Sequence, residues 1–153
     1  MRTFKDTEAR EWTVKITVST VKRVRDLIGV DLMDTVKAEL IQEMHRDPVL
    51  LASVIFAVCK PQADERGLTV EQFDDAMGGD VVQDASNAFF EALIDFFPAP
   101  RRGLLKQIME KIKALEALAI EAAGAKLNSG EFEKAVTDLL AGPLSIATPE
   151  SSE

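Results

Sequence analysis

The chain has few of the residues that most catalytic and metal-binding sites require. Its 153 residues include no tyrosine, one tryptophan, one cysteine and one histidine. A structural zinc site needs three or four thiolate or imidazole ligands, so the sequence excludes one. A nucleophilic pair would have to be His45 with Cys59, and Cys59 lies in an apolar run, where a thiol is normally inert packing. A lone cysteine forms no internal disulfide, as expected of a reduced, cytoplasmic protein.

The sequence also lacks long hydrophobic runs. The longest, Val49 to Cys59, is interrupted by Ser53 and is too short to span a bilayer. The N-terminus MRTFKDTEAR has no apolar core of the kind found in secretory signals. We therefore expect a soluble, intracellular protein with no membrane partner.

Phosphate and calcium motifs are absent as well. Gly78-Gly79-Asp80 is not followed by the Lys-Ser/Thr pair of a phosphate-binding loop. The segments Leu68 to Phe73 and Ser129 to Phe132 are not preceded by the spaced oxygen ligands of a calcium loop. Asp74 and Asp75 are adjacent, so on a helix their carboxylates diverge and cannot flank one bond. We expect a protein that is not an enzyme and has no cofactor, no metal and no catalytic residue.

The net charge of −8 is unevenly distributed. Residues 1–25 contain seven Lys/Arg and three Asp/Glu, a net of +4, and the other 128 residues contain eleven and twenty-three, a net of −12. An acidic body argues against nucleic-acid binding, which needs several cations on one face. The basic N-terminal part can meet an acidic partner or the acidic body of a second copy, or it is simply a solvated face.

The hydrophobic period changes from two to about 3.6 between Glu11 and Asp34. Trp12, Val14, Ile16 and Val18 alternate with polar residues, which predicts a strand. This strand can pair with Thr3 to Lys5, so that residues 2–17 close as a β-hairpin. Ser19 is then expected to cap a helix that ends at Gly29.

Helical patterns fill the rest of the chain. Asp47-Pro48 predicts a helix start, Lys60-Pro61 its end, and Thr69 with Gln72 a capping box. The remaining helices are expected over 32–46, 80–96, 101–123 and 128–142. We expect the 101–123 helix to bury one long stripe, made of Leu104/Leu105, Ile108, Ile112, Leu115 and Leu118/Ala119. The last helix should place Phe132, Val136 and Leu139/Leu140 inward.

These patterns predict a mainly α protein, a single domain of about six to seven helices with a small N-terminal β-hairpin. We expect the helical domain to cover residues 1–124. Residues 125–142 form a C-terminal helix or extension, and residues 143–153 a disordered tail.

Two groups of cations are candidate partner-binding residues. Lys22, Arg23 and Arg25 form a cationic face on the first helix. Arg101 and Arg102 lie at the start of a helix, where they oppose its macrodipole. Such a local conflict favours a binding partner or an intramolecular acid pair.

Several segments resemble the tail assembly chaperones of long-tailed bacteriophages. They are E-W-T-V-K-I-T-V after an N-terminal phenylalanine strand, V-K-R-V-R-D-L-I-G-V-D-L from Val21 to Leu32, D-P-V-L-L from Asp47, C-K-P-Q-A from Cys59 and D-F-F-P from Asp95. Together they span about residues 1 to 120. They are patterns of fold and contain no catalytic signature.

The resemblance implies a small, helical, non-enzymatic factor for viral morphogenesis that acts through protein–protein interaction. Such a factor binds the tape measure protein, keeps it soluble and helps to recruit tail tube subunits. It would work in the cytoplasm of the bacterial host and be absent from the mature virion. Self-association into a homo-oligomer is compatible with this role. In such families a frameshift often adds a C-terminal extension, and the residues from Gly142 fit the shorter product. The alternative is a structural virion component, such as a head–tail joining or tail terminator protein.

Overall fold

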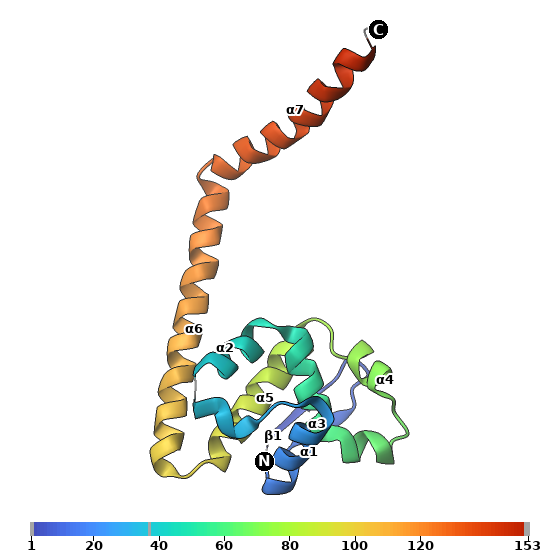
Figure 1. Ribbon diagram of the computed structural model, residues 1–153, viewed down its shortest axis with the longest axis vertical. Coiled ribbons are helices and arrows are strands. Elements are labelled where there is room, and N and C mark those ends of the chain that lie inside the picture. Colours follow the sequence, from blue (N-terminus) through green and yellow to red (C-terminus); the bar gives the residue numbers. More distant parts are fainter. Residues whose placement is uncertain (1, 37, 152–153) are drawn as a thin grey trace. The chain divides into compact units, whose positions relative to one another are not determined.

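The computed structural model is mainly helical, with one small sheet at the N-terminus (Figure 1). It describes the backbone of residues 2–36 and 38–151, and the side chains of residues 2–34 and 38–141. The strands are β1 (Arg2–Lys5) and β2 (Glu11–Val14), and the helices are α1 (Val18–Ile28), the 3-10 helix η1 (Leu32–Val36), α2 (Ala38–Arg46), α3 (Pro48–Glu65), α4 (Val70–Asp75), α5 (Asp80–Phe96), α6 (Ala99–Asn128) and α7 (Glu131–Ser151). The predicted mainly α fold with an N-terminal β-hairpin is confirmed.

The chain divides into two compact units, Met1–Met109 and Glu110–Glu153. The first unit contains the hairpin and α1 to α5. The division lies within α6. The expected helical domain of residues 1–124 stays a prediction. Each unit is described below by itself.

The hairpin pairs β1 with β2 in antiparallel register, with Phe4 opposite Trp12. Its turn is organised by Asp6, whose side chain is 2% exposed. One carboxylate oxygen accepts the N–H groups of Glu8 and Arg10, both at 2.9 Å. The other accepts Arg10 Nε at 2.8 Å and Trp12 Nε1 at 2.9 Å. Burial would raise the pKa of Asp6, but the hydrogen bonds from Trp12, Arg10 and Glu8 outweigh it and lower the pKa.

The second strand is shorter than predicted because the cap of α1 comes earlier than expected. Thr17 is extended, and its side chain accepts the N–H of Thr20. The predicted cap at Ser19 is therefore wrong, since Ser19 already lies inside the helix. The helix ends at Gly29 as predicted, where a φ of 68° places the backbone in the left-handed region that favours glycine.

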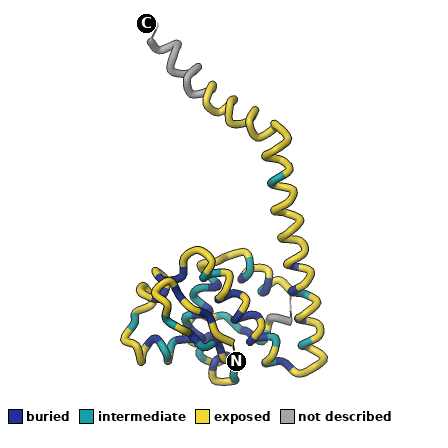
Figure 2. The backbone as a smooth tube through the Cα atoms, turned by 180° about the vertical axis from the view of Figure 1, so that it is seen from behind, coloured by how far each residue is buried: buried dark blue, intermediate teal, exposed yellow. Residues whose placement is uncertain are grey.

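The core of the first unit lies around α3, which packs against α1, α2, α4, α5 and β2. Figure 2 shows most of the buried residues, in dark blue, within this unit. Trp12 is fully buried, and its ring packs edge-on to that of Phe73, with the centroids 5.0 Å apart. Arg66 from the end of α3 lies over the Trp12 ring at 4.4 Å. The hairpin is thus held by helices, as a two-stranded sheet requires.

Two predicted helix signals are confirmed in detail. The Asp47 side chain accepts the N–H groups of Val49 and Leu50 at the start of α3. Thr69 and Gln72 exchange both hydrogen bonds of a capping box at the start of α4. The predicted end of α3 at Lys60-Pro61 is wrong, because the helix continues through Pro61 to Glu65.

The C-terminal helices are longer than predicted. α6 runs to Asn128, beyond Gly124, and the backbone of α7 runs through Gly142-Pro143 to Ser151. The side chains beyond residue 141 lie outside the described part. The expected disorder of residues 143–153 in solution stays a prediction.

Candidate functional site

Arg23, one of the predicted partner-binding residues, forms hydrogen bonds with the backbone of α3. Its Nη1 donates to the main-chain carbonyls of Ala57, at 3.2 Å, and Val58, at 2.9 Å. In a regular helix the Ala57 carbonyl accepts the N–H four residues later, which here belongs to Pro61 and does not exist. Arg23 therefore supplies the donor that the proline removes, which explains how α3 passes through Pro61.

The other two cations of α1 differ in their surroundings. Arg25 Nη2 lies 2.9 Å from Asp31 Oδ1, so this guanidinium binds the loop that follows its own helix. The hydrogen bond from Arg25, together with one from the Met33 N–H, lowers the pKa of Asp31. Lys22 is exposed and, within the described part of the chain, makes no hydrogen bond or ion pair. Lys22 is thus the freest cation of the predicted α1 face.

Arg101 and Arg102 lie in the first turn of α6, after Ala99. Arg102 Nε donates to the Phe97 carbonyl at 3.2 Å, so its partner is a main-chain oxygen of the preceding loop and not an acid. Arg101 is exposed and unpaired among the described residues. No hydrogen bond or ion pair in that part of the chain joins these residues to the cations of α1. Whether any of the five binds a partner stays a prediction.

Cys59, the residue considered as a nucleophile, lies in the core of the first unit. Cys59 is buried in α3, and its Sγ lies 3.8 Å from the Thr13 carbonyl oxygen. Burial raises the pKa of the Cys59 thiol to about 12, so the thiolate is absent at neutral pH. Among the described residues, no three His, Cys, Asp or Glu side chains are grouped to hold a metal ion. In the same part of the chain, no helix has both the length and the apolar character needed to cross a membrane.

The most unusual surface of the molecule is apolar and belongs to the second unit. Large apolar side chains of α6 and α7 are exposed here, with Leu115 and Leu118 each 60% exposed and Leu139 71% exposed. The full set in this stretch is Leu115, Leu118, Ile120, Leu127, Phe132, Val136, Leu139 and Leu140. Figure 2 shows the same stretch as almost continuously exposed. The predicted buried stripe of α6 is confirmed at Leu105 and Ile112 and is wrong at Leu115 and Leu118. The prediction that Phe132, Val136 and Leu139/Leu140 point inward is also wrong.

We name these eight residues the apolar stretch. The helical periodicity of the sequence correctly showed apolar residues at regular intervals in α6 and α7. It could not show whether another segment covers them.

A comparison of the chain with known protein families, with curated proteins and with solved structures finds no match to any of them.

Proposed function

We propose that this protein is a non-enzymatic tail assembly chaperone of a long-tailed bacteriophage, which binds the tape measure protein and helps to recruit tail tube subunits. The observation that carries the binding part of this proposal is the apolar stretch. Exposed apolar surface of this extent on a soluble protein is typical of a protein–protein interaction site. The choice of partner comes from the resemblance of residues 1 to 120 to the chaperone family.

The geometry favours an elongated helical partner. Exposed side chains such as Leu115, Leu118 and Leu139 recur along two successive helices, as in surfaces that pack against another helix. Single helices gain most of their stability from tertiary packing of an apolar face, so α6 and α7 should be stabilised when a partner covers them. A long helical protein offers such a face repeatedly, and several copies of this chain can then bind along it.

The chemistry of the chain supports a binding role. Its single thiol is buried and protonated, and its cations Arg23, Arg25 and Arg102 are already bound within the chain. The acidic body keeps the factor soluble while its apolar residues are exposed. The working location in this proposal is the cytoplasm of the host cell.

The test is co-expression with the long helical tail protein encoded in the same genome, followed by affinity purification. The expected result is that the large protein co-purifies with several copies of this chain. The double variant Leu118→Ser with Leu139→Ser should weaken the complex at least 100-fold, because each buried leucine contributes about 1.5–3 kcal/mol. Val49→Ser is the matched control, since Val49 is an exposed apolar residue of α3 and is 76% exposed.

Mass analysis of purified virions separates this proposal from a structural virion component. A chaperone should be absent from the finished particle. Detection of the chain at a fixed copy number in purified virions would refute the chaperone proposal and favour a joining or terminator role.

A further inference from the structure

A small hollow lies where the end of β2, the start of α1 and the second half of α3 meet, and its volume is about 290 Å³. Lys15 and Arg23 line it, together with polar residues such as Thr17 and Gln62. None of its lining residues, all of which belong to the described part of the chain, is an Asp or a Glu. The volume lies just below the range of pockets that hold drug-sized ligands, so the hollow suits a single small group.

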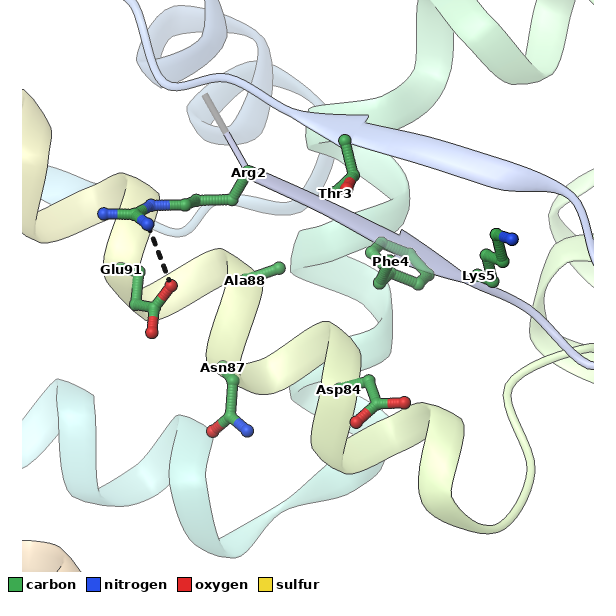
Figure 3. A pocket seen from close by; sticks show the side chains of 8 residues that line it. All are labelled: Arg2, Thr3, Phe4, Lys5, Asp84, Asn87, Ala88 and Glu91. Carbon is green, nitrogen blue, oxygen red and sulfur yellow. Dashed lines mark ion pairs between the residues drawn. The ribbon is translucent and has the colours of Figure 1, made fainter.

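Elsewhere in the first unit, cations are accompanied by carboxylates. The hollow between β1 and α5 contains acidic side chains as well as basic ones, and Arg2 reaches across it to Glu91 at 3.5 Å (Figure 3). Three further cations, each paired with an aspartate, are Arg10, Arg25 and Lys60. By contrast, no ion pair joins Lys15 or Arg23 to an acid among the described residues. The hollow beside α1 therefore carries positive charge that the chain itself does not neutralise.

Arg23 has one edge of its guanidinium group without a partner. Its Nη1 donates to the carbonyls of Ala57 and Val58, which holds the planar group in place. Its Nε and Nη2 make no hydrogen bond to any residue that the structure describes. These two nitrogens form the edge that binds two oxygens of one carboxylate or phosphate through parallel N–H···O bonds. Because Nη1 is already bound, a ligand at this edge restricts the side chain little further.

Lys15 brings a second positive charge to the same hollow. Thr20 Oγ1 donates to the Lys15 carbonyl at 3.0 Å, which holds the main chain of Lys15 against α1. Both main-chain groups of Thr13 are bonded by the side chain of Gln62, which fixes the adjoining wall to α3. The Lys15 side chain is exposed and, within the described residues, makes no hydrogen bond or ion pair. A hollow with fixed walls, two cations and no acid attracts a negatively charged group.

We infer that this hollow is a binding site for an oxyanion, namely a carboxylate or a phosphate group. Arg23 binds two of its oxygens through Nε and Nη2, and Lys15 adds the second charge. Arg23 then has two roles, because its Nη1 supplies the donor that α3 lacks at Pro61 while its other edge holds the ligand. The site shares no residue with the apolar stretch and does not rest on the proposed function.

The test follows the Nε–H resonance of Arg23 and the backbone amides of Thr17 and Thr20 by NMR while an anion is added to the full chain. The probes are inorganic phosphate and acetate, each added up to about 50 mM, a range that detects millimolar binding. Sodium chloride is adjusted to keep the ionic strength constant, so that a shift reports binding and not screening. The expected result is a saturable shift of the Arg23 Nε–H. Saturation by phosphate alone identifies a phosphate ligand, and saturation by acetate, alone or as well, identifies a site that accepts a side-chain carboxylate.

Two variants assign the effect to the hollow. Arg23→Lys keeps the charge but loses the two-nitrogen edge, and it should weaken binding about tenfold, as followed by the amides of Thr17 and Thr20. Lys15→Gln removes the second charge and should weaken binding about threefold. It keeps the test valid if Arg23→Lys does not fold, because Lys15 is exposed. Lys106→Gln is the matched control and should bind as the native chain does, since Lys106 is an exposed lysine of the first unit outside the hollow.

Three results would overturn the inference. One is the absence of a saturable shift at the Arg23 Nε–H with both phosphate and acetate. Another is equal anion binding by the native chain and by Lys15→Gln or folded Arg23→Lys. The third is an equal loss of binding in Lys15→Gln and Lys106→Gln, which would show that the anion responds to the overall charge of the protein and not to this hollow.

Discussion

The pairing of Arg23 with Pro61 leads to a quantitative prediction about coupled mutations. Pro61 leaves the Ala57 carbonyl without its helical donor, and Arg23 donates to that carbonyl and to the carbonyl of Val58. Arg23→Met keeps most of the aliphatic stem and removes the guanidinium. Hydrogen bonds to charged groups contribute about 1.5–3 kcal/mol, so Arg23→Met should lower the free energy of unfolding by about that amount.

The loss of unfolding free energy caused by Arg23→Met should be smaller when residue 61 has its own N–H. In a Pro61→Ala background the new N–H can donate to the Ala57 carbonyl, which leaves the Val58 carbonyl as the principal loss. Arg23→Met should then cost about 1 kcal/mol, which gives a coupling free energy between the two sites of about 1 kcal/mol or more. We therefore predict that Arg23→Met destabilises the native chain, which has Pro61, more than it destabilises the Pro61→Ala variant.

The assay is urea unfolding followed by the fluorescence of Trp12, the single tryptophan, which is fully buried in the first unit. Wild type, both single variants and the double variant form the cycle, with unchanged denaturant slopes as the condition for comparing them. Lys22→Met is the matched control, since Lys22 is an exposed cation on the same helix, and it should leave stability within about 0.5 kcal/mol. Additivity of the two mutations within about 0.5 kcal/mol would refute the structural role assigned to Arg23.

Further predictions concern the hairpin, the thiol and α6. Asp6→Asn should lower the free energy of unfolding by about 2–3 kcal/mol at neutral pH, because an amide nitrogen would face the donors of Arg10 and Trp12. Urea unfolding measures this loss, and a loss below about 0.5 kcal/mol would contradict the prediction. The folded-state pKa of Asp6 lies below its ordinary value of 3.8, so the stability that its ionised form contributes is present above 3.8 and is lost as the pH falls through the lower folded value. The Asp6→Asn variant should therefore show a weaker loss of stability in this acid range than the native chain. Cys59, with a pKa of about 12, should react with a thiol reagent at pH 7 only at the rate of unfolding, and fast labelling of the folded protein would show that the thiol is accessible. Arg101→Glu should weaken tape-measure binding and leave the melting temperature unchanged, because Arg101 is exposed; unchanged binding would remove this residue from the proposed interface.

The elements that could be predicted from the sequence are those whose signals are local. Asp47-Pro48 and the Thr69–Gln72 pair specify helix starts through bonds within a few residues, and both form as expected. The cap of α1 was missed because Thr17, Ser19 and Thr20 all carry hydroxyl groups near the same boundary, and the pattern of side chains does not decide among them.

The features that could not be predicted depend on contacts between distant residues. From the sequence alone, Pro61 predicts the end of a helix. The helix continues past it because Arg23 of α1 donates to the Ala57 carbonyl in place of the N–H that proline lacks. The anchoring of β2 likewise depends on Gln62 of α3, whose side chain bonds both main-chain groups of Thr13. The exposure of Leu118 and Leu139 depends on whether another segment covers them, and hydrophobic periodicity carries no information on that.

The central claim is that the apolar stretch binds and solubilises a long helical partner. It is tested most directly by the soluble yield of the tail protein in three parallel expressions, with the native chain, with the Leu118→Ser, Leu139→Ser variant, and alone. The account predicts a soluble tail protein only with the native chain, while the variant keeps the native unfolding curve of Trp12 because both leucines are exposed. Equal solubility of the tail protein in all three expressions, or equal rescue by the native chain and the variant, would contradict it.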